Sequence, residues 1–265
     1  MVLLECIFMI RGGYLGEDFS YKLTSSIVAI AIVIFDKKRN KRLDYFWVFL
    51  FGTIIWAGIE ALLQLSGTRV MPDRMLYGIE LPLWISIPLQ GIAEGSYLAV
   101  LGLFIADLVL DENTKKYGII FLVVIIIISF IRVFIIYGIE TPNIGGDVAS
   151  RRNIFGIGAV ILVGIMCGLG VYWLASAKPE PRKRGFYMFL FMLIISSFWI
   201  IFNVLAGQKW VEIGIENPNG TYSNLRRAPL LLEIAVLAYD IFFEIALIYV
   251  PFLAIPYMLG LIKQE

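Results

Sequence analysis

The 265-residue sequence contains no histidine and only two cysteines. Without histidine, the chain lacks the usual general base near pH 7, the common protein ligand of zinc and haem iron, and the base of Ser-His or Cys-His nucleophile pairs. Cys6 and Cys167 cannot form a metal site alone, and Cys167 lies inside an apolar run, where a small buried side chain is the usual interpretation. We therefore expect no zinc and no haem.

The sequence is also poor in charge. Charged residues make up 16% of the chain, and the formal net charge is only +1, which argues against general nucleic-acid binding. The chain contains no aspartate-rich prenyltransferase motif, no nucleotide-binding loop and no glycine-rich phosphate fingerprint. We therefore expect no nucleic-acid partner, and no motif identifies a cofactor.

Apolar residues, in contrast, make up 60% of the chain, far more than a soluble domain can bury. They occur in runs of about 20 residues, the length that crosses a bilayer as a helix. The sequence predicts an all-α, polytopic helical bundle, with residues 1–265 forming one transmembrane domain of about seven transmembrane helices. The predicted spans are 23–35, 45–65, 81–108, 117–137, 154–175, 186–206 and 230–262. The apolar stretch at 1–10 is too short to span, so we expect residues 1–21 to form a surface or re-entrant segment.

The distribution of lysine and arginine predicts the orientation of these spans. The loops on one side hold twelve of these residues and those on the other side nine, and the first loop alone holds five between 37 and 42. This places the N-terminus outside and the C-terminus in the cytoplasm of a multi-pass protein of the cell membrane, with the lipid bilayer as its partner. The predicted outer loops are 66–80, 138–153 and 207–229.

Several polar side chains lie inside the apolar runs. A charged side chain in hydrocarbon costs about 2.5–3.5 kcal/mol on insertion scales, so such residues are functional candidates by default. In the last span, Glu233, Asp240 and Glu244 are separated by seven and four residues and share one helical face. Polar residues of other spans lie at similar depth, between the outer surface and the midplane. We predict one outward-facing acidic cavity, with these substrate- or ion-binding candidates: Glu60, Glu94, Arg132, Asn203, Asp240 and Glu244.

Structural roles are the alternative for these residues. Arg132 can form a buried ion pair with Glu94 or Asp240, and such pairs add little stability but are costly to break. Asn203 can make an interhelical hydrogen bond. Asp107, at the inner end of the third span, is expected to face a lysine of the following loop.

Paired arginines in the outer loops form a second group of candidates. Arg151 with Arg152, and Arg226 with Arg227, can bind a phosphate or carboxylate group if their loops meet over the cavity. The alternative is that these arginines are solvated and pair with nearby acidic residues such as Glu212.

The surplus of buried carboxylates suits proton exchange, attraction of cations, or oxygen ligation of Mg²⁺, Ca²⁺ or Na⁺. The sequence therefore predicts transport or permeation of a cation or small polar solute. One alternative is an integral membrane enzyme acting on a lipid or polyprenyl-phosphate substrate, although the absence of histidine and of a catalytic spacing favours a non-enzymatic function. A second alternative is a receptor, sensor or membrane-complex subunit. Residues 230–262 contain no lysine, which excludes a retinal Schiff base there, and no feature indicates an oligomeric state.

Overall fold

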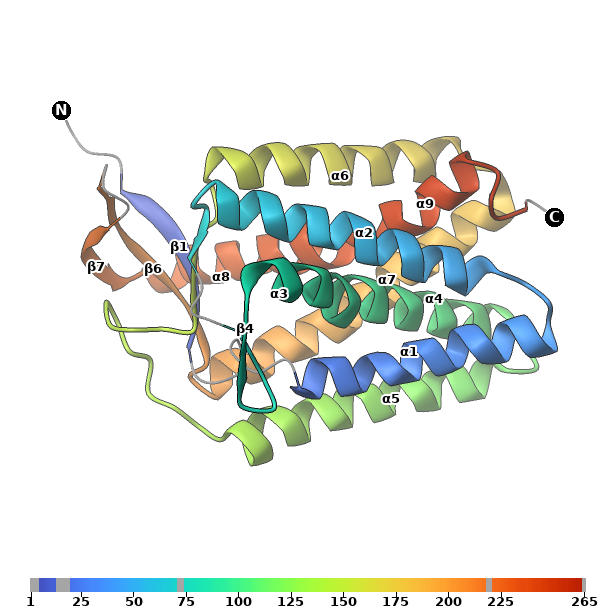
Figure 1. Ribbon diagram of the computed structural model, residues 1–265, viewed down its shortest axis with the longest axis horizontal. Helices are drawn as coiled ribbons and strands as arrows, with labels where there is room; N and C mark the ends of the chain where they lie inside the picture. The colour runs from blue at the N-terminus through green and yellow to red at the C-terminus, as the bar shows by residue number, and fades with distance from the viewer. Residues whose placement is uncertain (1–4, 13–19, 71–73, 218–220, 264–265) are drawn as a thin grey trace.

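The computed structural model describes residues 5–12, 20–70, 74–217 and 221–263. Its helices run back and forth along the long axis of the molecule, and a small sheet lies at one end (Figure 1). The helical segments are α1 (Ser20–Arg39), α2 (Asp44–Leu65), α3 (Leu83–Gln90), η2 (Gly91–Ser96), α4 (Tyr97–Leu110), α5 (Lys115–Ile131), η3 (Arg132–Tyr137), α6 (Ile157–Ser176), α7 (Pro179–Leu205), α8 (Leu230–Tyr239), η4 (Asp240–Ala246), η5 (Leu247–Tyr249) and α9 (Val250–Met258).

Five helices among the described residues are long and apolar enough to cross a membrane. They are 44–65, 83–110, 115–137, 157–176 and 179–205, close to five of the predicted spans. α5 is the most apolar and the least buried of them: Ile120 and Ile128 on it are each 57% exposed. Exposed apolar surface of this extent is expected of a helix that faces lipid. These helices confirm the prediction of a mostly helical fold with several helices long and apolar enough to span a membrane.

The first and last predicted spans are less regular than the other five. The span at 23–35 lies within α1, which carries charged residues at its C-terminal end. The span at 230–262 is divided, because the α-helix passes at Asp240 into the π-helix η4 and then into the short 3-10 helix η5. Pro251 and Pro256, which lack a backbone N–H, lie in the C-terminal piece α9.

The prediction of an all-α fold is wrong, because parts of the predicted outer loops and of the N-terminal segment form strands. Four strands from the three predicted outer loops join a strand from the N-terminal segment in a five-stranded antiparallel sheet of order β2-β5-β1-β6-β7, and β3 pairs only with β4. The strands are β1 (Cys6–Arg11), β2 (Arg69–Val70), β3 (Arg74–Leu76), β4 (Ile79–Leu81), β5 (Ser150–Asn153), β6 (Lys209–Glu216) and β7 (Tyr222–Arg227). Segments far apart in the sequence therefore meet at one end of the bundle.

β1 is the central strand of this sheet, which corrects the prediction of a surface or re-entrant segment for the described part of residues 1–21. Side chains alternate between the two faces of a strand. Phe8 and Ile10 pack with Trp210 on the outer face, whereas Met9 packs with Val211 and residues of α7 and α8 on the face toward the bundle. The sheet is therefore held to the helices by its own apolar core, and its inner face forms the end wall of the bundle.

Candidate functional site

All three π-helical segments among the described residues contain charged residues that the sequence singled out. Glu94 lies in η2, Arg132 in η3, and both Asp240 and Glu244 lie in η4. In a π-helix the backbone hydrogen bonds span five residues instead of the four of an α-helix, and such segments occur frequently at functional sites. Four of the six predicted binding residues therefore sit where the helical backbone departs from regular geometry.

The sheet presents four cations to these helices. In the strand register, Arg69 lies directly opposite Arg152, and Arg11 lies directly opposite Lys209. Directly opposed residues of antiparallel strands share a face, and like charges in that position are destabilising. The inner face of the sheet is therefore a row of cations that requires negative charge from below.

Carboxylates of the helices supply part of that charge. Lys209 Nζ lies 2.7 Å from Asp240 Oδ2, and Arg152 pairs with both Asp240, at 3.5 Å, and Glu244. At the start of α8, Glu233 accepts hydrogen bonds from Arg227 at 3.1 and 3.2 Å. The carboxylates of Glu233, Asp240 and Glu244 therefore each pair with a cation from a different strand.

Two more carboxylates pair with the sheet from other helices. Glu60 of α2 is 1% exposed and forms an ion pair with Arg69, and Gln64 donates to its second oxygen at 2.6 Å. Glu94 lies 4.0 Å from Arg11, whose guanidinium also stacks over the ring of Trp199 at 4.7 Å. Charges of opposite sign thus meet along the whole junction between sheet and bundle.

A cavity of about 220 Å³ lies at this junction. Aromatic and aliphatic side chains form much of its wall, including Trp56, Tyr97, Leu98 and Ile125. Its basic lining residues come mainly from the strands and its acidic ones from the helices. The charged lining residues are Arg11, Arg69, Arg74, Arg132, Arg152, Lys209, Glu94, Asp240 and Glu244.

The charge of this lining differs from the predicted acidic cavity. Six basic side chains face three carboxylates, which leaves three excess positive charges when all groups are ionised. Counting Glu60, which is buried behind Arg69, the excess is two. The sequence suggested an acidic surplus because only Arg132 was expected to lie deep in the bundle; the other cations arrive on strands that were interpreted as loops.

Five buried polar atoms of residues that line the cavity have no hydrogen-bond partner among the described residues. Three are donors, Trp56 Nε1, Arg69 Nε and Arg132 Nε, and two are acceptors, Gln90 Oε1 and Glu244 Oε1. Buried polar groups are normally paired, and each unpaired one is costly. Unused hydrogen-bonding capacity is therefore found next to the cavity, in the residues that line it.

Burial also changes the acidity of the sheet cations. It lowers the pKa of Lys209 from the ordinary lysine value, although Asp240 raises it, and it lowers the pKa of Arg11, although Glu94 raises it. For Arg152, the carboxylates of Glu244 and Asp240 outweigh burial and raise the pKa. Arg152 is thus the most firmly paired of these cations.

The structure brings together most of the predicted binding residues but not all of them. Glu94, Arg132, Asp240 and Glu244 line one cavity. Asn203 does not line it: this residue is fully buried, and its amide donates to the carbonyl of Trp199 one turn earlier at 2.7 Å.

Arg132 does not form the ion pair considered from the sequence. Among the described residues its guanidinium has no carboxylate within ion-pair distance; it donates to the hydroxyl of Tyr137 at 3.3 Å and stacks over that ring. A cation without a carboxylate partner on a cavity wall is available to a ligand.

The paired outer arginines do not act as pairs, because consecutive strand residues point to opposite faces. Arg152 faces the cavity, whereas Arg151 faces outward and pairs with the fully buried Glu212 at 3.2 Å. Arg226 pairs with Glu5 at the surface, and Arg227 pairs with Glu233. Of the four, only Arg152 lies on the cavity wall.

The cations that sequence reasoning missed are Arg11, Arg69, Arg74 and Lys209. A signal for two of them was present: residues 6–11 form a short apolar run rich in residues that favour strands, and residues 211–216 alternate between apolar and other residues. These patterns would have predicted strands, although no local signal gives their register or their position over the bundle.

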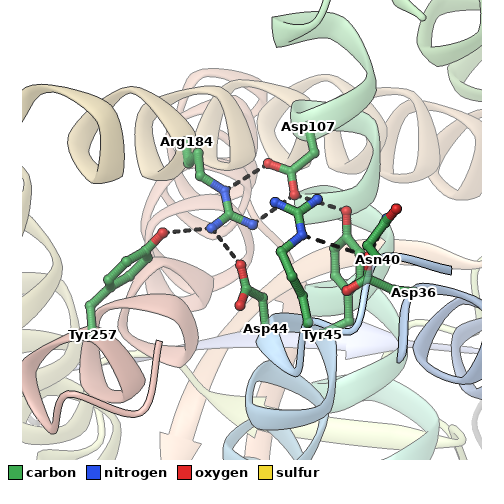
Figure 2. Close-up of polar contacts among 8 residues, drawn as sticks. Asp36, Asn40, Asp44, Tyr45, Asp107, Arg184 and Tyr257 are labelled. Atoms are coloured by element: carbon green, nitrogen blue, oxygen red, sulfur yellow. Dashed lines mark hydrogen bonds and ion pairs between the residues drawn. The ribbon is translucent and has the colours of Figure 1, made fainter. Parts of the chain in front are cut away.

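A second polar cluster lies at the opposite end of the bundle (Figure 2). Arg184 of α7 makes two hydrogen bonds of 2.7 Å to the carboxylate of Asp107, and it also donates to Asp44 at 2.9 Å and to the hydroxyl of Tyr257 at 2.5 Å. Tyr45 donates to Asp107 at 2.8 Å. The prediction that Asp107 faces a lysine of the next loop is therefore wrong, since its partner is Arg184 of a distant helix.

The described residues contain no group of three His, Cys, Asp or Glu side chains placed to hold a metal ion. Comparison of the chain with protein-family models, with curated proteins and with solved structures found no match in any of the three.

Proposed function

We propose that this chain is a multi-pass protein of the cell membrane that binds a small anionic solute in the cavity beneath the sheet and carries it across the bilayer. The observation that supports this proposal is the charge of the cavity wall, where six basic side chains face three carboxylates. Any anion reduces this excess, and an anion with two charges balances the two that remain when Glu60 is counted. A cation, the solute expected from the sequence, would add to it.

The cavity contains the chemistry that anion binding requires. Arginine presents a fork of N–H donors that matches phosphate and carboxylate oxygens. Among the described residues, Arg132 has a tyrosine hydroxyl as its hydrogen-bond partner and no carboxylate within ion-pair distance. Arg11, held by a 4.0 Å ion pair and by the ring of Trp199, lies on the same cavity wall. A phosphate or carboxylate between these two groups would pair charges that the protein leaves in excess.

The volume of the cavity bounds the solute. Small-molecule pockets are typically about 300–1,000 Å³, and this cavity, at about 220 Å³, is smaller. It suits a small metabolite or a single headgroup rather than a large cofactor.

The arrangement of the connections supports seven crossings. The strands β1, β2, β5, β6 and β7 gather at one end, and the short connections 40–43, 111–114 and 177–178 lie between helices that meet at the other end. Seven helical passes with the sheet outside and residues 259–263 in the cytoplasm satisfy this alternation and the lysine and arginine bias of the loops. The cavity then opens near the outer surface.

The test is ligand stabilisation of the purified protein, because a ligand that binds only the folded state raises its thermal midpoint. Inorganic phosphate, acetate, Na⁺ and Mg²⁺ are compared on the wild type and on Arg132→Gln. We expect the anions to raise the midpoint of the wild type, and this shift to be much smaller in the variant. Arg226→Gln, which removes an exposed arginine outside the cavity, should respond like the wild type.

Transport is measured separately, as uptake of labelled phosphate or acetate into proteoliposomes, with Arg226→Gln as the matched control for Arg132→Gln. Stabilisation by Na⁺ or Mg²⁺ but by no anion would overturn the proposal in favour of the cation carrier. Chemical conversion of a bound anion, without net uptake, would overturn transport in favour of a membrane enzyme.

A further inference from the structure

We infer that the solute is an amphipathic anion, with its phosphate or carboxylate group beneath the sheet and an apolar chain directed into the bundle. This inference rests on the anion binding proposed above and names the class of anion. It is carried by the order of polar and apolar residues along four segments of the cavity wall.

Two helices run toward the sheet along the cavity. On α5 and its continuation η3, the lining residues Ile125, Ser129 and Arg132 follow at steps of four and three residues, so they share one helical face. At 1.5 Å per residue, Ile125 lies about 10 Å deeper in the bundle than Arg132. The face therefore changes from a cation at the sheet to an aliphatic side chain at depth.

α7 shows the same order. Its lining residues are Met192, Ile195, Ser196 and Trp199, which share one helical face, and α7 is followed by the strand β6. Trp199 stacks with Arg11 and lies 5.3 Å from Lys209 Nζ, beneath the sheet. Met192, two turns deeper, is buried in the main apolar core.

The other two segments run away from the sheet. Polar residues should therefore come before apolar ones in their sequences, and they do. From α3 through η2 to α4, the lining passes from Gln90 and Glu94 to Leu98. Along η4 and η5, it passes from Asp240 and Glu244 to Ile245 and then to the ring of Tyr249, whose hydroxyl donates to the carbonyl of Glu94. Charged and amide groups again lie nearer the sheet, and aliphatic side chains lie deeper.

Four independent segments thus give one gradient, polar beneath the sheet and apolar toward the core. A hydrated inorganic anion would make no use of the apolar half, whereas an apolar chain placed there would leave water. The donors of Arg132 and Arg11 are at the polar end, where the charged group of such a molecule would lie. The same chemistry is offered by a free short-chain anion and by the phosphate headgroup of a lipid with the first part of its chain.

The experiment measures affinity for inorganic phosphate and for methyl, ethyl, butyl and hexyl phosphate, by calorimetry on the protein in phosphatidylcholine nanodiscs. Burial of each methylene should improve affinity about fourfold until the cavity is full. A series in which affinity does not change with chain length would overturn the inference while leaving anion binding intact. Failure of every phosphate to bind would instead overturn the proposed function.

A matched pair of variants locates the chain. Ile125→Ser places a polar group at the deep end of the cavity, and we expect it to reduce the gain per methylene without changing affinity for inorganic phosphate. Ile120→Ser, on the same helix but 57% exposed and outside the cavity, should behave like the wild type. Equal slopes in wild type and Ile125→Ser would overturn the proposed orientation.

The source of the anion is separated by the nanodisc lipid. If the site takes a lipid headgroup, nanodiscs that contain phosphatidic acid should weaken the apparent affinity for hexyl phosphate by competition. If it takes a soluble solute, hexyl phosphate should bind equally in both kinds of nanodisc. Both results support the amphipathic class, which the chain-length series alone can overturn.

Discussion

The two ends of this bundle solve the problem of buried charge in different ways. At the end far from the sheet, one arginine serves two carboxylates: Arg184 bonds to Asp107 and Asp44, and tyrosine hydroxyls complete the cluster. At the sheet end, six basic side chains line a cavity with three carboxylates. The first cluster has fewer positive than negative charges, whereas the second has an excess of positive charge and lines a cavity.

The state of the polar atoms makes the same distinction. Among the described residues, one buried side-chain atom without a hydrogen-bond partner, Asp36 Oδ2, lies in the cluster drawn in Figure 2, and none belongs to Arg184 or to the groups that bond to it. Five such atoms belong to residues that line the cavity. The network around Arg184 joins α2, α4, α7 and α9, whereas the lining with excess positive charge is the site proposed to bind an anion. Ionisable residues inside a membrane protein therefore need to be sorted by their partners before they are assigned a function.

The largest effect is expected for Arg184→Ala, which should lower the free energy of unfolding. The variant leaves Asp107 and Asp44 without their cation in a site where the side chains of all three are less than 20% exposed. Loss of one partner of a buried pair typically costs about 3–5 kcal/mol. Denaturation of the purified protein in detergent should show a free energy of unfolding reduced by that order.

The control is Arg226→Ala, which removes the same side chain from an ion pair whose arginine is 63% exposed. Exposed pairs contribute about 0–1 kcal/mol, so its stability should match the wild type. Equal stability of Arg184→Ala and Arg226→Ala would contradict the assignment of the Arg184 cluster as a structural network.

At the cavity, the same kind of substitution should affect binding rather than stability. Arg132→Gln removes a cation that has no carboxylate partner among the described residues. A hydrogen bond to a charged group contributes about 1.5–3 kcal/mol, so affinity for phosphate should fall by about ten- to a hundredfold. The free energy of unfolding without ligand should not fall, because no ion pair is broken. A large loss of stability in this variant would make Arg132 a structural residue.

The apolar runs were sufficient to predict the helical part of this fold. A run of about 20 apolar residues has one solution in a bilayer, and five predicted spans coincide with long apolar helices of the structure. The sheet was missed because its strands are short and come from four separate segments. β2 has two residues and β5 has four, too few for a period-two pattern to be recognised.

The candidate site was predicted only in part, because the sequence indicates its acidic residues but not the cations that the strands contribute. Glu94, Asp240 and Glu244 are conspicuous because charge is rare in an apolar run, and all three line the cavity. Arg11 is the last residue of β1 and Lys209 the first residue of β6, and a charged residue at the end of a short strand is too common to indicate a site. Only the register of β1 against β6, which depends on tertiary packing, places these two cations opposite each other over the helices. The sign of the cavity could therefore not be obtained from the helices alone.

Glu94→Gln tests whether the cavity binds an anion or a cation. Glu94 lies on the cavity wall, 4.0 Å from Arg11, so removing its charge increases the positive excess. Affinity for phosphate or acetate should rise severalfold, an effect of about 1 kcal/mol, as measured by calorimetry. If the cavity instead took a cation, the same variant would bind Na⁺ or Mg²⁺ less well and gain nothing for anions.

The smallest expected effect concerns pH and Lys209. Burial lowers the pKa of this lysine from its ordinary value of 10.5, with Arg11 and Arg152 acting in the same direction and Asp240 in the opposite one. As the pH rises through the lowered pKa, Lys209 loses its proton and the wall loses a positive charge, so affinity for acetate should fall. Between the lowered pKa and 10.5, the unfolded chain binds more protons than the folded one, so stability should rise over the same range.

General alkaline damage would lower affinity and stability together, whereas titration of Lys209 moves them in opposite directions. Lys209→Arg, which keeps its charge at these pH values, should show neither change, and a persistent fall in its affinity would assign the effect to another group.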